Sequence, residues 1–235
     1  MSGMLARFHR RRQTVATSTL LLFAALTAGA CAARLHAQSA EPPGHATSTP
    51  YSGDLSIFEY KDRDQKLQIQ HVFDLLGMHP GTSIADIGAG SGWLTVRAAA
   101  RVAPGGTVFA EDINPVAIHA ITDRASREKL PNITAVLGAA DDPMLPPKSV
   151  DVVVMLKVYH EIAHTELLLQ HLKPALRPGA RIGIIDRNGD GSDHGLNEDI
   201  VVKEMRAAGF HRVGRYDFTK ADGQDYFLIF KQDGQ

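Results

Sequence analysis

The sequence predicts an α/β fold in which a mostly parallel sheet is covered by helices on both faces. From residue 83 onward, short apolar runs alternate with segments of helical spacing, which is typical of parallel strands joined by crossover helices. The last two apolar runs have no helix between them, so the final strand is expected to be antiparallel. The seven expected strands are residues 83–87, 106–112, 132–138, 149–156, 180–186, 213–218 and 226–230.

The first expected strand ends in an acid, Asp86, and leads into a turn with glycine at every second position, at Gly88, Gly90 and Gly92. Glycine adopts φ > 0 easily, and its missing Cβ lets a ligand approach the backbone. A strand, a glycine turn and a helix N-terminus together indicate a nucleotide-binding unit. The dinucleotide fingerprint G-x-G-x-x-G would need a third glycine where this chain has Trp93.

The second expected strand ends in two acids, Glu111 and Asp112, and leads directly into a helix. Pro115 suits the first helical turn, and Asn114 can cap it. An acid about 20 residues after a glycine turn can accept hydrogen bonds from both ribose hydroxyls of an adenosine. These two acids are therefore candidates for ribose binding.

The pattern Asp-x-Gly-x-Gly-x-Gly of residues 86–92, with the Asp-Ile-Asn-Pro that ends the second strand, resembles the class I S-adenosylmethionine-dependent methyltransferases. The resemblance covers about residues 57–231. It implies a Rossmann-like sheet whose seventh strand lies between the fifth and sixth, and S-adenosylmethionine as the cofactor. It also assigns ribose binding to Asp112, with Glu111 as the runner-up. The residues expected around the cofactor in this half are Asp86, Gly88, Ala89, Gly90, Gly92, Asp112 and Ile113.

The third and fourth strands are expected to contribute further residues. In the family, an acid after the third strand commonly binds the adenine amino group. The position directly after Gly138 is Ala139, so we expect Asp141 or Asp142 to take this role. The near-continuous apolar run of residues 149–156 predicts a central strand, and it delivers Lys157 to the ligand-binding end of the sheet, where we expect it to contact the cofactor.

Methyl transfer is an in-line displacement at a carbon bonded to a sulfonium, so the protein mainly aligns the acceptor and excludes water. His160 is the expected catalytic base where the acceptor must lose a proton, because histidine titrates near neutrality. A structural hydrogen bond at a helix start is the alternative role for His160. Tyr159 is expected to orient the acceptor or to face the sulfonium. Tyr60 and Arg63 are candidates for the methionine end of the cofactor.

The fourth strand is not followed by Asn/Asp-Pro-Pro-Tyr, a run typical of enzymes that methylate amino groups of DNA bases or glutamine. A small-molecule acceptor is therefore favoured, with oxygen or carbon at least as suitable as nitrogen. Residues 1–40 hold five arginines and no acid, and the rest of the chain has 20 basic and 26 acidic residues. An acidic body without a basic stripe argues against a nucleic-acid substrate.

Two other functions compete with this interpretation. Residues 160–164 match H-E-x-x-H, in which His160 and His164 would bind zinc beside Glu161, so an exported zinc metallopeptidase is one alternative. A non-catalytic module that only binds an adenosyl ligand is the other. Residues 186–191 begin like a calcium loop, but Asn197 stands where that loop needs glutamate, so no metal is expected in the preferred interpretation.

The N-terminus is predicted to be a targeting segment. A basic start precedes an apolar run, so residues 1–37 are expected to be a signal peptide or membrane anchor that leads to an exported, periplasmic protein. Cleavage before Cys31 or Gln38, lipidation and retention all stay open, and membrane contact is expected through this segment alone. Residues 38–56 are predicted to be a flexible linker and residues 57–235 the methyltransferase domain. One cysteine allows no internal disulfide.

Overall fold

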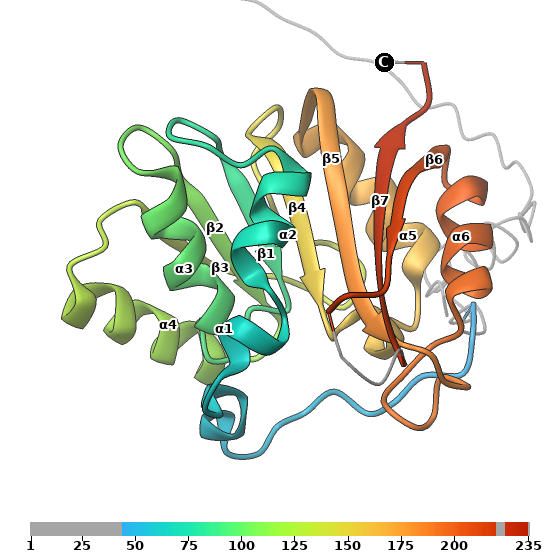
Figure 1. Ribbon diagram of the computed structural model, residues 1–235, viewed down its shortest axis with the longest axis horizontal. Coiled ribbons are helices and arrows are strands. Elements are labelled where there is room, and N and C mark those ends of the chain that lie inside the picture. The colour runs from blue at the N-terminus through green and yellow to red at the C-terminus, as the bar shows by residue number, and fades with distance from the viewer. Residues whose placement is uncertain (1–43, 220–223, 235) are drawn as a thin grey trace, which may run out of the picture. The chain divides into compact units, whose positions relative to one another are not determined.

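The computed structural model describes residues 44–219 and 224–234, which belong to one compact unit (Figure 1). Its sheet has seven strands in the order β3-β2-β1-β4-β5-β7-β6. Strands β1 to β5 pair in parallel, and β7 is antiparallel to both of its neighbours. The strands are β1 (Ile84–Ile87), β2 (Val108–Asp112), β3 (Ile133–Leu137), β4 (Val150–Leu156), β5 (Leu176–Arg187), β6 (Phe210–Tyr216) and β7 (Asp225–Gln232). The predicted fold class is confirmed, as is the seventh strand between the fifth and sixth.

Helices cover both faces of this sheet. One apolar cluster joins α2 and α3 to the sheet, and a second cluster on the other face joins α5 and α6 to it. The α-helices are α1 (Arg63–Lys66), α2 (Ile69–Leu76), α3 (Trp93–Val102), α4 (Pro115–Glu128), α5 (Thr165–Leu172) and α6 (Glu198–Ala207). Short 3-10 turns are η1 (Leu55–Glu59), η2 (Tyr159–Glu161) and η3 (Lys173–Ala175).

The burial of the central strand β4 on both faces explains why its sequence is a nearly continuous apolar run. Val152 and Val154 pack toward α2 and α3, while Val153 and Met155 pack toward α5 and α6. Successive side chains of a strand point to opposite faces, so a strand covered on both sides has no polar position to alternate with. The same parallel register brings the carboxyl ends of β1, β2 and β4 to one edge of the sheet.

The predicted targeting segment, residues 1–37, lies outside the described residues, as do residues 38–43 of the predicted linker. From residue 44 the chain is hydrogen bonded to the unit: the Gly44 N–H donates to the Ala163 carbonyl, and the Ser48 N–H donates to the His160 carbonyl. His45 and Ser48 are both buried. We call residues 44–51 the N-terminal strap, seen in blue in Figure 1. Within residues 44–219 and 224–234, no helix is both long enough and apolar enough to cross a bilayer.

Truncating Phe227 on β7 should strongly destabilise the fold. Its ring is fully buried and lies 5.6 Å from the Tyr216 ring and 6.2 Å from the Phe218 ring. We expect Phe227→Ala to lower the free energy of unfolding by about 3–5 kcal/mol, because a large cavity replaces the ring. Val116→Ala, at a side chain that is 66% exposed, is the control and should change it by less than about 0.5 kcal/mol. Equal effects in urea denaturation would contradict this packing.

Candidate active site

A cavity of about 630 Å³ opens at the carboxyl ends of β1, β2 and β4. Its volume is in the range typical of sites for small molecules and cofactors. It is lined by the turns after these strands, by the chain before α2 and by the N-terminal strap. Predicted cofactor residues that line it are Tyr60, Arg63, Asp86, Gly88, Ala89, Gly90, Asp112, Ile113 and Lys157.

The glycine turn after β1 has the backbone geometry that its sequence suggests. Gly88, Gly90 and Gly92 have φ of 66°, 55° and 74°, in the region that favours glycine. A Cβ on Gly88 would lie 2.4 Å from Cγ2 of Val158, so the turn also needs glycine for close packing. Gly92 is the N-cap of α3 and does not line the cavity.

Asp86 and Arg63 are both buried and both line the cavity, and the charge of Arg63 acts on the Asp86 carboxyl. The Thr95 hydroxyl donates to Oδ2 of Asp86 at 2.6 Å. Burial raises the pKa of Asp86 to about 7, while the Thr95 hydrogen bond and the Arg63 charge oppose this rise. The Arg63 guanidinium lies 4.2 Å from the centre of the Trp93 ring and donates to the Phe58 carbonyl. Its Nε is buried and has no hydrogen-bond partner.

The two acids that end β2 lie in different environments. Asp112 accepts two backbone hydrogen bonds of 2.8 Å, from the Gly90 N–H to Oδ2 and from the Asn114 N–H to Oδ1. Glu111 is almost fully buried, and its Oε2 lies 3.4 Å from the Gly88 nitrogen that donates to it. Burial raises the pKa of Glu111 to about 8. Asp112 is therefore the more accessible carboxylate, although both line the cavity.

After β3 the structure brings alanines, not acids, to the cavity wall. Ala139 and Ala140 line it, whereas the predicted adenine ligands Asp141 and Asp142 do not. Oδ1 of Asp142 accepts a hydrogen bond of 2.8 Å from the Met144 N–H, and the backbone of this turn closes between Ala139 and Asp142. The tight turn directs both carboxylates away from the wall.

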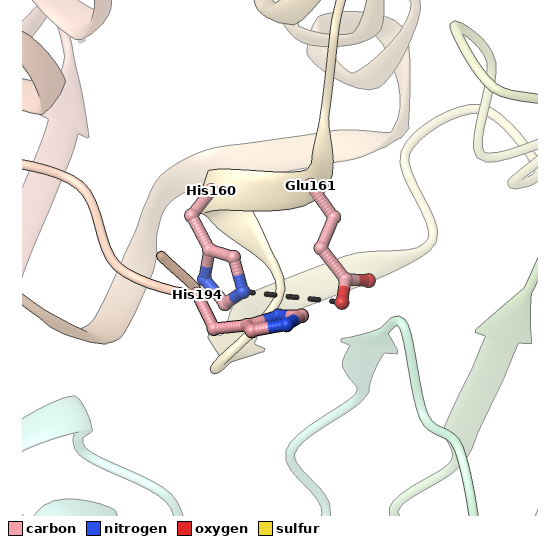
Figure 2. A group of neighbouring side chains, drawn as sticks. All are labelled: His160, Glu161 and His194. Atoms are coloured by element: carbon pink, nitrogen blue, oxygen red, sulfur yellow. Dashed lines mark ion pairs between the residues drawn. The ribbon is translucent and has the colours of Figure 1, made fainter. Parts of the chain in front are cut away.

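The H-E-x-x-H segment does not form one helical turn. His160 and Glu161 belong to the 3-10 turn η2, and His164 is the N-cap of the separate helix α5. Among the described residues, the group of side chains close enough to share a metal ion combines His160 and Glu161 with His194 (Figure 2). The predicted zinc pair of His160 and His164 is therefore wrong, because the chain turns between them.

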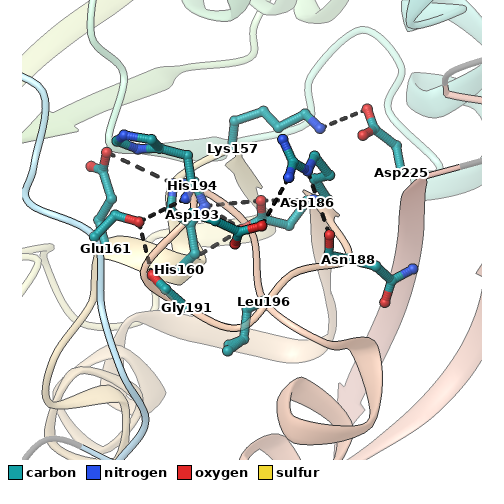
Figure 3. Close-up of polar contacts among 12 residues, drawn as sticks. Lys157, His160, Glu161, Asp186, Asn188, Gly191, Asp193, His194, Leu196 and Asp225 are labelled. Atoms are coloured by element: carbon teal, nitrogen blue, oxygen red, sulfur yellow. Dashed lines mark hydrogen bonds and ion pairs between the residues drawn. The ribbon is translucent and has the colours of Figure 1, made fainter.

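The two predicted catalytic residues, Tyr159 and His160, do not line the cavity. The Tyr159 side chain is fully buried, and its hydroxyl donates to Oε2 of Glu204 on α6 at 3.0 Å. His160 is also buried, and its Nδ1 lies 2.9 Å from Oδ1 of Asp186 at the end of β5 (Figure 3). Tyr159 thus faces the core, whereas the His160 ring lies behind the cavity wall formed by Glu161.

Lys157 lines the cavity, but its ammonium is engaged elsewhere. Its Nζ lies 2.6 Å from Oδ2 of the buried Asp225 on β7, as Figure 3 shows. The backbone of Lys157 has a φ of 60°, so this residue occupies the strained turn that ends β4. A contact between Lys157 and a cofactor would therefore come from its backbone or its aliphatic carbons.

Residues 84–179 match the family model described as "Methyltransferase domain". This range contains the glycine turn, both acids that end β2, and β4. The matched region is thus similar to the class I S-adenosylmethionine-dependent methyltransferases, the family that the motifs of residues 86–92 and 112–115 resemble. S-adenosylmethionine is therefore the cofactor that the family assigns to this cavity.

Relatives and solved structures agree with this family. The chain is 32% identical over 115 residues to nocamycin O-methyltransferase of Saccharothrix syringae, an alignment that covers 49% of this chain and 41% of that protein. It is 29% identical over 122 residues to the ubiquinone/menaquinone C-methyltransferase UbiE of Ectopseudomonas mendocina (strain ymp), covering 52% and 48%. The chain thus spans less than half of each relative. A methyltransferase structure from Aquifex aeolicus shares the fold, with a TM-score of 0.67 and 21% identity over 76% of this chain and 98% of that one.

Two parts of the cavity wall were not predicted from the sequence. Residues 47–51 of the N-terminal strap line the cavity, although their polar composition is typical of a linker. Glu161 lines it as well, in the place expected for His160. Burial raises the pKa of Glu161 to about 7, and the neighbouring His160 opposes this. Glu161 stands next to the predicted base His160 in the sequence. The sequence does not show which of the two side chains the 3-10 turn η2 directs into the cavity.

The buried Asp86 should make the stability of the protein fall as the pH rises. Its folded pKa of about 7 exceeds the ordinary value of 3.8, so between these values the folded protein binds more protons than the unfolded chain. The free energy of unfolding should therefore fall through this window and level off above it. Thr95, Arg63 and Asp112 are the polar groups that act on this carboxyl.

Urea denaturation of Asp86→Asn tests this titration. Relative to the unmodified protein, the variant should gain about 1–3 kcal/mol between about pH 5 and about pH 8, because it cannot lose this proton. Glu111→Gln is the matched variant. Its stability relative to the unmodified protein should also increase with pH, but at slightly higher pH, because the pKa of Glu111 is about 8. A stability difference between Asp86→Asn and the unmodified protein that is constant with pH would show that Asp86 does not titrate in this range.

Proposed function

We propose that this protein transfers the methyl group of S-adenosylmethionine to a small-molecule acceptor. The observation that carries the proposal is the cavity that combines the glycine turn, Asp112 and the buried pair of Asp86 and Arg63. Similarity to the family supports the cofactor and the reaction class. The acceptor and the activity of the whole protein are inferred from the site.

The ribose of the cofactor is proposed to bind Asp112. A carboxylate offers about four lone-pair positions, and the backbone of Gly90 and Asn114 uses two of them. The remaining lone pairs of Asp112 can accept hydrogen bonds from both ribose hydroxyls. Adenine would then lie against Ile113, Ala139 and Ala140, an apolar wall of suitable chemistry for a flat ring.

The methionine end of the cofactor is proposed to bind between Asp86 and Arg63. The free Nε of Arg63 is a buried donor without a partner, which is costly unless a ligand accepts from it. A carboxylate suits the guanidinium, and an ammonium suits Asp86. The sulfonium adds a second positive charge, which the acidic residues of the cavity wall favour.

In the transfer itself, a lone pair of the acceptor forms a bond to the methyl carbon while the carbon–sulfur bond breaks and sulfur keeps the electron pair. S-adenosylhomocysteine and the methylated acceptor are the products, and a hydroxyl or carbon acceptor also releases its proton to a base or to solvent. The protein contributes alignment and exclusion of water. Glu161 and residues 47–51 of the N-terminal strap line the cavity but are not among the residues assigned to the cofactor, so we place the acceptor beside them.

The class of acceptor is inferred from the cavity and from the relatives. Two of them are described as an O-methyltransferase for nocamycin and a C-methyltransferase of ubiquinone and menaquinone biosynthesis. Both descriptions support a small organic acceptor that is methylated at oxygen or carbon. The apolar residues among the cavity lining, such as Leu55, Phe58 and Ile162, favour an acceptor with an apolar body.

We also propose that residues 1–37 export or anchor the protein, so that the site works outside the cytosol. The basic start and the apolar run of this segment support the proposal. A cofactor made in the cytosol must then reach the exported domain. Cell fractionation with an antibody against the domain tests this directly, and a wholly cytosolic signal would refute it.

Removing the carboxylate of Asp112 should weaken cofactor binding about 100-fold, because two charge-assisted hydrogen bonds to ribose are lost. Calorimetry with S-adenosylmethionine measures this for Asp112→Ala. Asp141→Ala is the matched control, since its carboxylate does not line the cavity, and its affinity should stay within about twofold. Unchanged affinity in Asp112→Ala would reject the ribose assignment, and a loss in Asp141→Ala would restore the adenine role of Asp141.

Cofactor turnover should depend on an acceptor. We expect the protein to convert S-adenosylmethionine to S-adenosylhomocysteine when a metabolite extract is added, and Asp112→Ala to reduce the rate at low cofactor concentration. A solved structure of the same fold, SpnF, is described as a cyclase (TM-score 0.61, 13% identity), so the fold does not fix the reaction. Tight cofactor binding without turnover in any extract would favour the non-catalytic adenosyl-binding module.

A further inference from the structure

A cluster of three metal-binding side chains lies at the edge of the cavity. One ligand atom from each of His160, Glu161 and His194 falls within 4.8 Å of the others. His160 and Glu161 come from the turn after β4, and His194 comes from the loop between β5 and α6 (Figure 2). Similarity to the family gives no role to this combination, and the H-E-x-x-H spacing pairs His160 with a different histidine.

His160 is already oriented as a metal ligand. Its Nδ1 lies 2.9 Å and 3.0 Å from the two oxygens of Asp186, and its backbone N–H donates to the same carboxylate at 3.2 Å. Asp186 is fully buried, so this carboxylate keeps the proton on Nδ1 and leaves Nε2 as a free electron-pair donor. Nε2 lies 3.9 Å from Oε1 of Glu161. A carboxylate behind a histidine is the usual support of metal-bound imidazole.

His194 is held toward the pair by its backbone. Its φ is 59°, in the left-handed region that is costly for a residue other than glycine. The His194 N–H donates to Oγ of Ser48 at 2.9 Å, and the Ser48 hydroxyl donates to the Gly191 carbonyl at 2.8 Å. The N-terminal strap therefore fixes the loop in this conformation. The His194 ring stands at 90° to the His160 ring, with 5.9 Å between their centres.

We propose that His160 Nε2, a ring nitrogen of His194 and the carboxylate of Glu161 bind one divalent transition-metal ion of the Zn²⁺ type. Two imidazoles and one carboxylate form a ligand set typical of zinc and related ions, whereas Mg²⁺ and Ca²⁺ prefer oxygen ligands. Zinc ligands lie about 2.0–2.1 Å from the ion, so tetrahedral donors are about 3.3 Å apart. The donors must therefore close by up to about 1.5 Å, through the exposed His194 ring and a smaller shift of the Glu161 carboxylate, whose Oε1 is 3.9 Å from His160 Nε2.

The position of the ion follows from Glu161, which belongs both to the cluster and to the cavity wall. Three protein ligands leave the fourth position of a tetrahedral ion open. That position can take an oxygen atom of the acceptor and lower the pKa of its hydroxyl. This role of the ion rests on the proposed function, whereas the metal site itself does not.

Calorimetry with Zn²⁺ on the full chain, after treatment with a chelator, tests the site, and Co²⁺ absorption reports the ligand geometry. We expect one equivalent of Zn²⁺ to bind and His194→Ala to weaken it at least tenfold. Glu161→Gln, which keeps the side-chain shape, should weaken it as well. His164→Ala is the matched control because His164 is the histidine of the H-E-x-x-H spacing that the cluster excludes, and its affinity should not change.

Two results would overturn the proposal: Zn²⁺ affinity that is unchanged in His194→Ala, or affinity that is lost in His164→Ala. Circular dichroism of each variant verifies that the fold is intact. S-adenosylmethionine binding is measured on the same samples and should be retained in His194→Ala. Loss of the metal site with retained cofactor binding leaves the proposed function standing, and retained metal binding without cofactor binding rejects that function alone.

Discussion

The site depends on how closely the turn after β1 approaches the turn after β4. Gly88 and Val158 are so close that a single added methyl group on the glycine would overlap the valine side chain. Parallel pairing of β1 with β4 sets this distance, and the apolar layers on both faces of the sheet keep the strands in register. The backbone of the glycine turn is thereby fixed beside Glu111 and Asp112 at the end of β2. A ligand in the cavity can therefore contact the turn and these carboxylates at the same edge of the sheet.

Burying several acids at this edge has an electrostatic cost that a cationic ligand can offset. Asp86 and Glu111 are both buried, and burial raises the pKa of each because it disfavours the ionised carboxylate. The guanidinium of Arg63 compensates only one part of the cavity. S-adenosylmethionine carries positive charges on its sulfonium and its ammonium, whereas S-adenosylhomocysteine keeps only the ammonium, so these acids favour the cofactor over its product.

The sequence was sufficient for features that depend on local pattern. Strand positions, the glycine turn and the acid at Asp112 all follow from short motifs combined with the rules of parallel sheets. Features that depend on rotation or on distant contacts were not accessible. The 3-10 turn after β4 directs Tyr159 into the core and Glu161 toward the cavity, although both follow the same strand. His194 contacts His160 from the loop between β5 and α6, and the spacing of the two residues in the sequence does not predict this contact.

The N-terminal strap shows that the working unit is longer than the sheet and helices that define the family. His45 stacks on Tyr159 with 6.1 Å between ring centres, and Ser48 holds the loop of His194. A recombinant fragment that starts at residue 57, where the α/β pattern begins, would lack one wall and expose buried aromatic surface. Proteolysis that removes residues beyond position 44 would therefore take away part of the cavity wall.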